Sequence, residues 1–248
     1  MAIKILTCDS EKISAKKLAD SLGVTLGLCQ CDTGNNDTDV FVRWGSSRFC
    51  GCKAKEYPKV INSSVAILNA VDKELALKLL STKVKIPTLY WGNTTIPAGV
   101  RVVYRERYHS EGSNFKVITG PFRVEGPGYH ATEFIPTPYE YRAWVCGDRV
   151  RVAKRIKLRE NEDYEVNPCR SKWGYEVITT TDNMKKLALA SVKVLKLDFG
   201  AVDFLWSEDH NCYFVLEVNT GPSLDTPALL EFFRAGVLAL AESKYPAR

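Results

Sequence analysis

Two strand-like runs near the C-terminal end, AVDFLW and CYFVLEVN, constrain the fold of this chain most. Only a short polar turn at residues 207–211 separates them, so they predict an antiparallel hairpin. Strict alternation on the second strand predicts two sets of side chains: Tyr213, Val215, Glu217 and Asn219 on one face, and Phe214, Leu216 and Val218 on the other. A carboxylate and an amide should therefore project together from one side of the sheet.

Three oxygen-bearing side chains should meet on this hairpin. If the turn centres near Asp209 and His210, Asp203 lies opposite Glu217, with Asn219 close by. Such oxygens suit Mg²⁺, which keeps several waters and takes further ligands from phosphates. On alternation alone, an equally good interpretation is that Asp203 and Glu217 line a solvated strand face.

The rest of the chain alternates between helical and strand patterns. A strand at 3–8, a helix at 12–22 and a strand at 39–44 indicate a small α/β lobe. A helix should begin at Asp72, which can cap it, and turn Leu75, Leu79 and Leu80 toward a core. Three further groups complete the pattern: the strands VRVVYR, FKVIT and HATEFI, the hairpin EYRAWV with RVRVAKRIKLR, and a helix from about Asp182 to Lys196. The fold class is therefore mixed, with α/β and α+β parts.

Composition excludes a membrane-spanning protein. Hydrophobic residues make up 45% of the 248 residues, and no apolar run approaches the roughly 20 residues that cross a bilayer. The N-terminal segment MAIKILTCDS lacks the pattern of a secretory signal, so we expect a cytoplasmic protein with reduced thiols. The pairs Cys29/Cys31 and Cys50/Cys52 leave a zinc site open, although structural zinc usually has longer spacing within each pair.

The formal net charge of +5 does not identify a partner. The 34 basic residues are spread along the chain, with local richness only between Arg142 and Arg159. A mildly basic surface suits a polyanion such as ATP as well as it suits nucleic acid.

The segment FGAVDFLWSEDHNCYFVLEVNTGPSLD closely resembles the C-terminal motif of the ATP-grasp ligases. In that family an Asp, a Glu and an Asn two residues later hold the magnesium ions that bridge the ATP phosphates. The resemblance implies that Asp203, Glu217 and Asn219 are metal ligands for two Mg²⁺ ions, with Mn²⁺ as an alternative.

A second resemblance concerns ATEFIPTPYEYRAWV, which looks like the hinge of the same family. It implies that the backbone near Glu133, Phe134 and Ile135 bonds the adenine ring and that Glu140 holds the ribose hydroxyls. A carboxylate can accept from two neighbouring hydroxyls, which agrees with this role.

The segment VVYRERYHSEGSNFKVI is similar to the family's phosphate-binding strand and loop. It implies that Arg105, in a position that is usually Lys, contacts phosphates and that Gly112 and Ser113 belong to the loop. This loop departs from the family pattern because it has one glycine and is slightly long.

Further cations are implied by the same resemblance. Lys73, in NAVDKELALKLL, matches a second nucleotide-contacting lysine, although an exposed helix lysine is an equally good interpretation. Arg142, Lys154 and Arg155 match positions beside the γ-phosphate and the acyl phosphate. Because neighbours on a strand face opposite ways, Lys154 and Arg155 cannot both face the site without a bulge, and Arg155 is the better candidate.

The resemblance, which covers about residues 61–227, implies an ATP-grasp fold close to the D-alanine–D-alanine ligase and ribosomal-protein glutamate ligase branches. The expected division is an N-terminal α/β lobe at 1–70, a central lobe at 71–135 and a C-terminal lobe at 136–248. The implied activity joins a small-molecule or peptide carboxylate to an amine through an acyl phosphate. A kinase on the same scaffold and a nucleic-acid-binding module are the alternatives, and neither is favoured.

Overall fold

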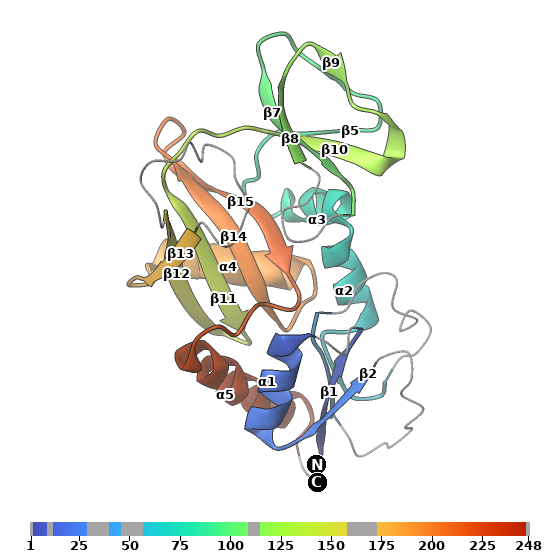
Figure 1. Ribbon diagram of the computed structural model, residues 1–248, viewed down its shortest axis with the longest axis vertical. Helices are drawn as coiled ribbons and strands as arrows, with labels where there is room; N and C mark the ends of the chain where they lie inside the picture. Colours follow the sequence, from blue (N-terminus) through green and yellow to red (C-terminus); the bar gives the residue numbers. More distant parts are fainter. Residues whose placement is uncertain are drawn as a thin grey trace.

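The computed structural model describes residues 2–8, 12–28, 40–45, 57–108, 115–157 and 173–246. These residues form three main sheets, stacked along the long axis of the molecule in Figure 1. The predicted strands and helices are present, together with several elements that the sequence patterns did not predict.

The N-terminal sheet is parallel and lies at the lower end of Figure 1. Its order is β2-β1-β3-β4, with bounds Thr25–Leu28, Ile3–Thr7, Val40–Arg43 and Val60–Ile61. Helix α1 (Ile13–Leu22) covers it and ends at Gly23, whose φ of 65° closes the last turn in the left-handed region. This unit agrees with the predicted α/β lobe.

The central sheet is antiparallel and lies at the opposite end of the molecule. Its order is β5-β10-β7-β8, with bounds Leu89–Trp91, Tyr129–Glu133, Arg101–Glu106 and Phe115–Thr119. A short ribbon of β6 (Thr95–Ile96) and β9 (Phe122–Arg123) and the 3-10 turn Gly126–Gly128 complete this part. Ile96, Val102, Val124 and Ala131 form its small core.

The C-terminal sheet is antiparallel and carries the predicted hairpins. Its order is β13-β12-β11-β14-β15, with bounds Trp173–Val177, Arg149–Lys157, Glu140–Cys146, Phe199–Ser207 and Cys212–Asn219. Helix α4 (Asp182–Val194) packs on one face, where Met184, Ala188 and Val192 are buried against the strands. Helix α5 (Pro227–Lys244) packs on the other face.

Two consecutive helices, α2 (Ser64–Val71) and α3 (Lys73–Leu80), connect the N-terminal and central sheets. The side chain of Asp72 caps α3 by accepting a hydrogen bond from the backbone N–H of Leu75 at 3.1 Å, as predicted. The predicted core-facing residues of α3 are partly confirmed: Leu80 is buried and the half-buried Leu79 packs against the same cluster. Leu75 is only half-buried, whereas Ala76 and Leu77 are buried. The helix presents a face rotated from the predicted one because it packs against the C-terminal sheet through the same cluster as α4.

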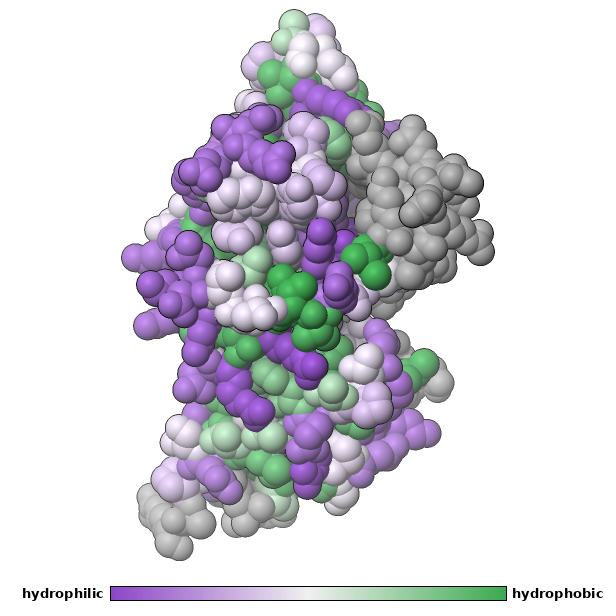
Figure 2. All heavy atoms as spheres, turned by 90° about the vertical axis from the view of Figure 1, so that its left-hand side faces the viewer, coloured by the Kyte–Doolittle hydropathy of each residue, from purple (hydrophilic) through white to green (hydrophobic). Residues whose placement is uncertain are grey.

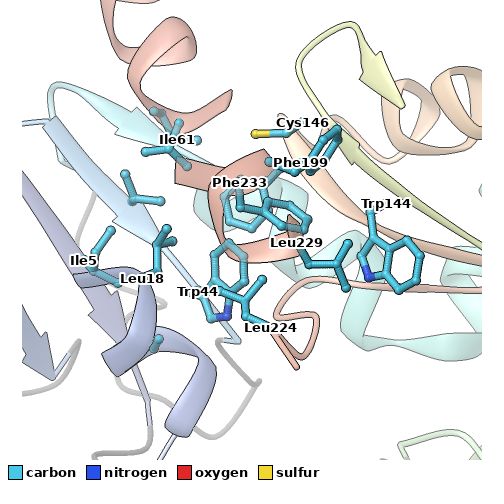
Figure 3. Close-up of a cluster of buried hydrophobic side chains, with 14 of the residues drawn as sticks. Ile5, Leu18, Trp44, Ile61, Trp144, Cys146, Phe199, Leu224, Leu229 and Phe233 are labelled. Carbon is cyan, nitrogen blue, oxygen red and sulfur yellow. The ribbon is translucent and has the colours of Figure 1, made fainter. Parts of the chain in front are cut away.

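The largest buried cluster joins the N-terminal and C-terminal sheets (Figure 3). Trp44, just after β3, stacks on Phe199 of β14 with ring centroids 4.8 Å apart and meets the edge of Phe233 of α5 at 5.0 Å. Its indole N–H donates to Ser14 Oγ at 3.0 Å. The N-terminal sheet therefore shares its core with the C-terminal sheet. The division at residues 70 and 135 stays a prediction.

The surface of the described residues is mostly polar on the face drawn in Figure 2, where hydrophobic residues appear in small groups among hydrophilic ones. Within the described ranges, every helix is too short or too polar to cross a membrane. Cys146 and Cys212 are free thiols, but Cys8 is disulfide-bonded, so the expectation of reduced thiols is wrong for Cys8. The pairs Cys29/Cys31 and Cys50/Cys52 lie outside the described residues.

Candidate functional site

A β-bulge in the last hairpin determines which side chains reach the site. Asp203 pairs with Glu217 and Phe204 pairs with Val215, so Leu216 is the extra residue. Strict alternation is therefore wrong beyond this point: Val215 and Val218 pack toward α4 on the same face, while Phe214 and Leu216 pack with Leu205. The predicted pairing of Asp203 with Glu217 is confirmed.

Asp203 is held by an arginine and an amide. Arg142, its pairing partner on β11, donates from Nε and Nη2 to the two carboxylate oxygens at 2.6 and 2.7 Å. The amide nitrogen of Asn219 donates to Asp203 Oδ2 at 3.2 Å. Burial alone would lower the pKa of Arg142, but the charge and hydrogen bonds of Asp203 raise it above its ordinary value.

Glu217 meets cations from the central part of the chain. Lys73 Nζ, at the start of α3, donates to Glu217 Oε1 at 2.9 Å and to the carbonyl of Val218 at 3.3 Å. Arg105 of β7 is deeply buried, which lowers its pKa, while attraction to Glu217, Glu140 and Asp203 opposes the shift. Lys73 and Arg105 therefore lie beside the carboxylates of the site, and their predicted contacts with the nucleotide stay a prediction.

Glu140 and Arg155 form a further pair, with Arg155 Nη1 donating to Glu140 Oε2 at 2.6 Å. Lys154 pairs in register with Tyr141, whose ring packs in the cluster on the α4 side of the sheet. Because neighbouring side chains alternate, Lys154 faces away from Arg155 and lies over the ring of Tyr139, 5.1 Å from its centroid. The structure brings Arg142, Arg155 and Glu140 to one face and leaves Lys154 on the other.

The predicted hinge connects the central and C-terminal sheets. The carboxylate of Glu133 accepts from Thr88 Oγ1 at 2.6 Å, and its backbone N–H donates to the carbonyl of Thr88 at 2.9 Å. The N–H of Phe134 donates to the carbonyl of Arg101 at 2.9 Å, and the Arg101 guanidinium lies 4.3 Å from the centroid of the Phe134 ring. These N–H groups are thus engaged within the protein.

An apolar group next to the hinge was missed at the sequence level. Ile135 packs with Leu205 and Phe214, and Leu216 and Cys212 lie against them. It was missed because only the bulge turns Leu216 and Phe214 to the side that bears Glu217, and the bulge has no signal in the sequence. Ligand pockets are lined mainly by hydrophobic and aromatic side chains, so this group is a candidate surface for a ring system.

The donor set fits a hard divalent cation. Asp203, Glu217 and Asn219 bring two carboxylates and an amide together, which suits Mg²⁺ or Mn²⁺ rather than a metal that prefers sulfur. In the described ranges no three His, Cys, Asp or Glu side chains gather into a metal-binding group, so the third oxygen would come from the amide. Gly112 and Ser113, predicted for the phosphate loop, lie outside the described residues.

A cavity of about 650 Å³ lies elsewhere, between residues 83–85, helix α4 and the end of the β14–β15 hairpin. Its walls include Lys85, Lys186, Trp206 and Tyr213 and none of the predicted site residues. It is therefore separate from the carboxylate and cation cluster.

Comparison with known proteins agrees with this geometry. Residues 132–228 match the model of the RimK-like ATP-grasp domain. A protein named "Probable alpha-L-glutamate ligase" from Haemophilus influenzae is 31% identical over 189 residues, which is 66% of this chain and 60% of that protein. The chain thus spans about 60% of the length of this relative.

Solved structures that resemble nearly the whole chain include two ligases. The ATP-grasp ligase PsnB, solved with a minimal precursor, matches with a TM-score of 0.68 and 13% identity over 97% of this chain and 99% of that one. D-alanine–D-alanine ligase from Bacillus anthracis matches with a TM-score of 0.66 and 14% identity over 98% and 99%. The predicted fold class is confirmed: the chain has the ATP-grasp fold, and its residues 132–228 match the RimK-like ATP-grasp domain.

Proposed function

We propose that this chain is an ATP-dependent ligase that joins a carboxylate to an amine. The observation that carries the proposal is the convergence of Asp203, Glu217 and Asn219 with Lys73 and Arg142 on one face of the C-terminal sheet. Binding and transferring a phosphoryl group of a triphosphate requires cations together with oxygens that hold metal ions, which is the combination present here.

The carboxylate oxygen of the first substrate attacks the γ-phosphorus of ATP. The bond from that phosphorus to the β–γ bridging oxygen breaks, so ADP leaves and an acyl phosphate forms. The amine nitrogen of the second substrate then attacks the acyl carbon, the bond to the phosphate oxygen breaks, and the nitrogen loses a proton. The products are an amide, ADP and phosphate.

The roles of the side chains follow from their charges. Phosphoryl transfer depends on positioning and charge neutralisation rather than on a protein nucleophile. We assign Lys73 and Arg105 to the α- and β-phosphates, and Arg142 and Arg155 to the γ-phosphate and the acyl phosphate. Glu140 would accept from the ribose hydroxyls once Arg155 turns toward phosphate, and the cluster of Ile135, Leu205 and Phe214 would lie against the adenine ring.

Asp203, Glu217 and Asn219 would hold Mg²⁺, with Mn²⁺ as an alternative and two ions as the expected number. Such ions neutralise charge on the phosphate oxygens. The solved structures with Mg and ADP, and with ATP, are of other ATP-grasp ligases, and they support this cofactor choice. Lys73 and Arg142 would release the carboxylates when the metal and nucleotide enter.

The relatives suggest where to look for substrates. Several relatives are named "Probable alpha-L-glutamate ligase", and PsnB was solved with a precursor peptide. We therefore propose an amino acid, with glutamate as the first to test, as the amine, and a peptide or small-molecule carboxylate as its partner.

Trapping the acyl phosphate tests the proposal. The chain is incubated with Mg-ATP, hydroxylamine and a panel of amino acids and peptides, and the products are identified by mass spectrometry. We expect ADP together with an acyl hydroxamate, and a loss of roughly 100-fold in ADP release for Asp203→Asn because charge stabilisation of the phosphates is weakened.

The outcomes are distinct. A phosphorylated hydroxyl compound with no hydroxamate would identify a kinase on the same fold. Absence of ADP release with every acceptor, together with salt-sensitive binding of nucleic acid, would replace the ligase with a nucleic-acid-binding function.

A further inference from the structure

Asp72 lies at the junction of α2 and α3 and makes more contacts than a helix cap requires. Besides the N–H of Leu75, its carboxylate accepts from Arg107 Nε at 2.8 Å to Oδ1 and 3.0 Å to Oδ2, and from Arg107 Nη2 at 2.5 Å. The hydroxyl of Tyr108 donates to Oδ2 at 3.2 Å. A single carboxylate therefore joins the start of α3 to the two residues that follow β7.

Both joined elements carry a cation of the proposed nucleotide site. Lys73 is the residue directly after Asp72, and Arg105, near the end of β7, lies two residues before Arg107. The backbone adds a direct link, since the N–H of Lys73 donates to the carbonyl of Arg107 at 3.2 Å. The spacing of Lys73 and Arg105 is thus set by the contact between residues 72–73 and 107–108.

The pair is built to hold one geometry. Asp72 is 9% exposed, and Arg107 uses the planar fork of its guanidinium, which fixes orientation as well as distance. Burial alone would raise the pKa of Asp72, but hydrogen bonds from Arg107 and Leu75 hold it below its ordinary value. Asp72 is therefore charged whenever a ligase of this kind would work near neutral pH.

We propose that Asp72 and Arg107 are positioning residues that fix Lys73 and Arg105 relative to each other for binding the triphosphate. This inference rests on the proposed ATP-dependent function. Neither side chain touches the nucleotide in this scheme. Each acts through the neighbouring cation, so removing the pair should weaken nucleotide binding without removing any charge that contacts phosphate.

The test measures the affinity for Mg-AMPPNP by isothermal titration calorimetry in four proteins: the wild type, Asp72→Asn, Lys73→Met and the double variant. Asp72→Asn keeps an oxygen to accept from the N–H of Leu75 but loses the ion pair. We expect it to raise Kd by about tenfold, because displacements near 1 Å can cost on the order of 100-fold in rate at such sites. In the Lys73→Met background the same change should raise Kd by less than about threefold, since effects acting through one residue are not additive.

Further variants distinguish an effect on the position of the cations from an effect on folding stability. Arg107→Lys should fall between the wild type and Asp72→Asn, because a lysine keeps the charge but not the fork. Glu231→Gln, which removes one carboxylate of an exposed pair with Arg234 on α5, is the matched control and should leave Kd unchanged. Thermal unfolding of every variant with Mg-AMPPNP absent shows how much stability each has lost.

The results distinguish a failure of the positioning role from a failure of the proposed function. If the wild type binds Mg-AMPPNP and Asp72→Asn binds equally well, the positioning role is overturned while the proposed function stands. The positioning role is also overturned if Asp72→Asn raises Kd by the same factor in the wild-type and Lys73→Met backgrounds. A general loss of stability gives that pattern. If the wild type itself does not bind Mg-AMPPNP, the proposed function fails first.

Discussion

At the scale of single residues, the site consists of oppositely charged pairs. Asp203 pairs with Arg142, Glu217 with Lys73, and Glu140 with Arg155. Each pair places a proposed phosphate ligand against a proposed metal or ribose ligand. The charged side chains of the site thus neutralise one another. Bound nucleotide and metal would later take over this neutralisation.

This balance gives a prediction for Arg142→Met. The change leaves the carboxylate of Asp203 without its bidentate partner, which should lower the free energy of unfolding by on the order of 1 to 3 kcal/mol. Millimolar Mg²⁺ should return part of that loss, because the cation can neutralise Asp203 in place of the arginine.

Differential scanning calorimetry with Mg²⁺, and with Na⁺ at the same ionic strength, measures the effect. Mg²⁺ should stabilise Arg142→Met against unfolding more than it stabilises the wild type. Na⁺ should affect the stability of both proteins equally. An equal response of both proteins to Mg²⁺ would contradict the assignment of Asp203 as a metal ligand.

At the scale of elements, the sequence predicted those with a clear local signal. The cap at Asp72 and the turn at 207–211 set the start of α3 and the register of the last hairpin, and both predictions are confirmed. Helix α2 was missed because SVAILNAV is nearly all apolar and lacks a helical period. The bulge at Leu216 was missed because one extra residue leaves no local composition signal, although it reverses which faces its neighbours occupy.

Helix α5 begins with a capping signal in the sequence. Thr226 accepts from the N–H of Leu229 through its side chain, and Pro227 occupies the first helical position. Thr226→Ala should lower the free energy of unfolding by about 1 kcal/mol, because the cap is lost and α5 supplies Phe233 to the shared core.

Urea denaturation followed by tryptophan fluorescence measures this loss. Thr226→Ser keeps the hydroxyl and should remain within a few tenths of a kcal/mol of the wild type. A Ser variant as unstable as the Ala variant would show that the methyl group of Thr226, rather than the cap, stabilises the helix.

At the scale of the whole molecule, chain segments far apart in sequence meet beside the metal-binding strand. The N–H of Gly45, after β3, donates to the carbonyl of Thr220, after β15, at 3.4 Å. A Cβ on Gly221 would lie 2.3 Å from the Cα of Gly45, so this approach requires glycine. Such contacts depend on tertiary packing, and residue patterns within either segment could not predict them.

Gly221→Ala tests the importance of this junction. The methyl group must push the two backbones apart, which should lower the free energy of unfolding by about 2 kcal/mol. It should also raise KM for Mg-ATP, because residue 221 follows Asn219 closely. Chemical denaturation and steady-state ADP release measure the two effects.

Gly128→Ala is the matched control, since a Cβ there would meet no atom within 4 Å. It should leave both quantities close to wild type. Because the buried cluster spans the N-terminal and C-terminal sheets, Gly221→Ala should still unfold in one transition. Two separated transitions would mean that the two sheets are independent folding units.

The bulge at Leu216 has a consequence for protein engineering. The alternation of side chains along strand β15 changes phase at the bulge, so the strand consists of two halves. One half supplies an apolar wall, and the other supplies oxygen ligands. A redesign that kept every residue but paired the strand without the bulge would still form a hydrogen-bonded ladder. It would nevertheless turn Phe214 into the opposite layer, because a shift of register by one residue exchanges the two faces of the strand. The ring-binding surface would then be separated from the chelating one, so a well-folded variant could lose its chemistry.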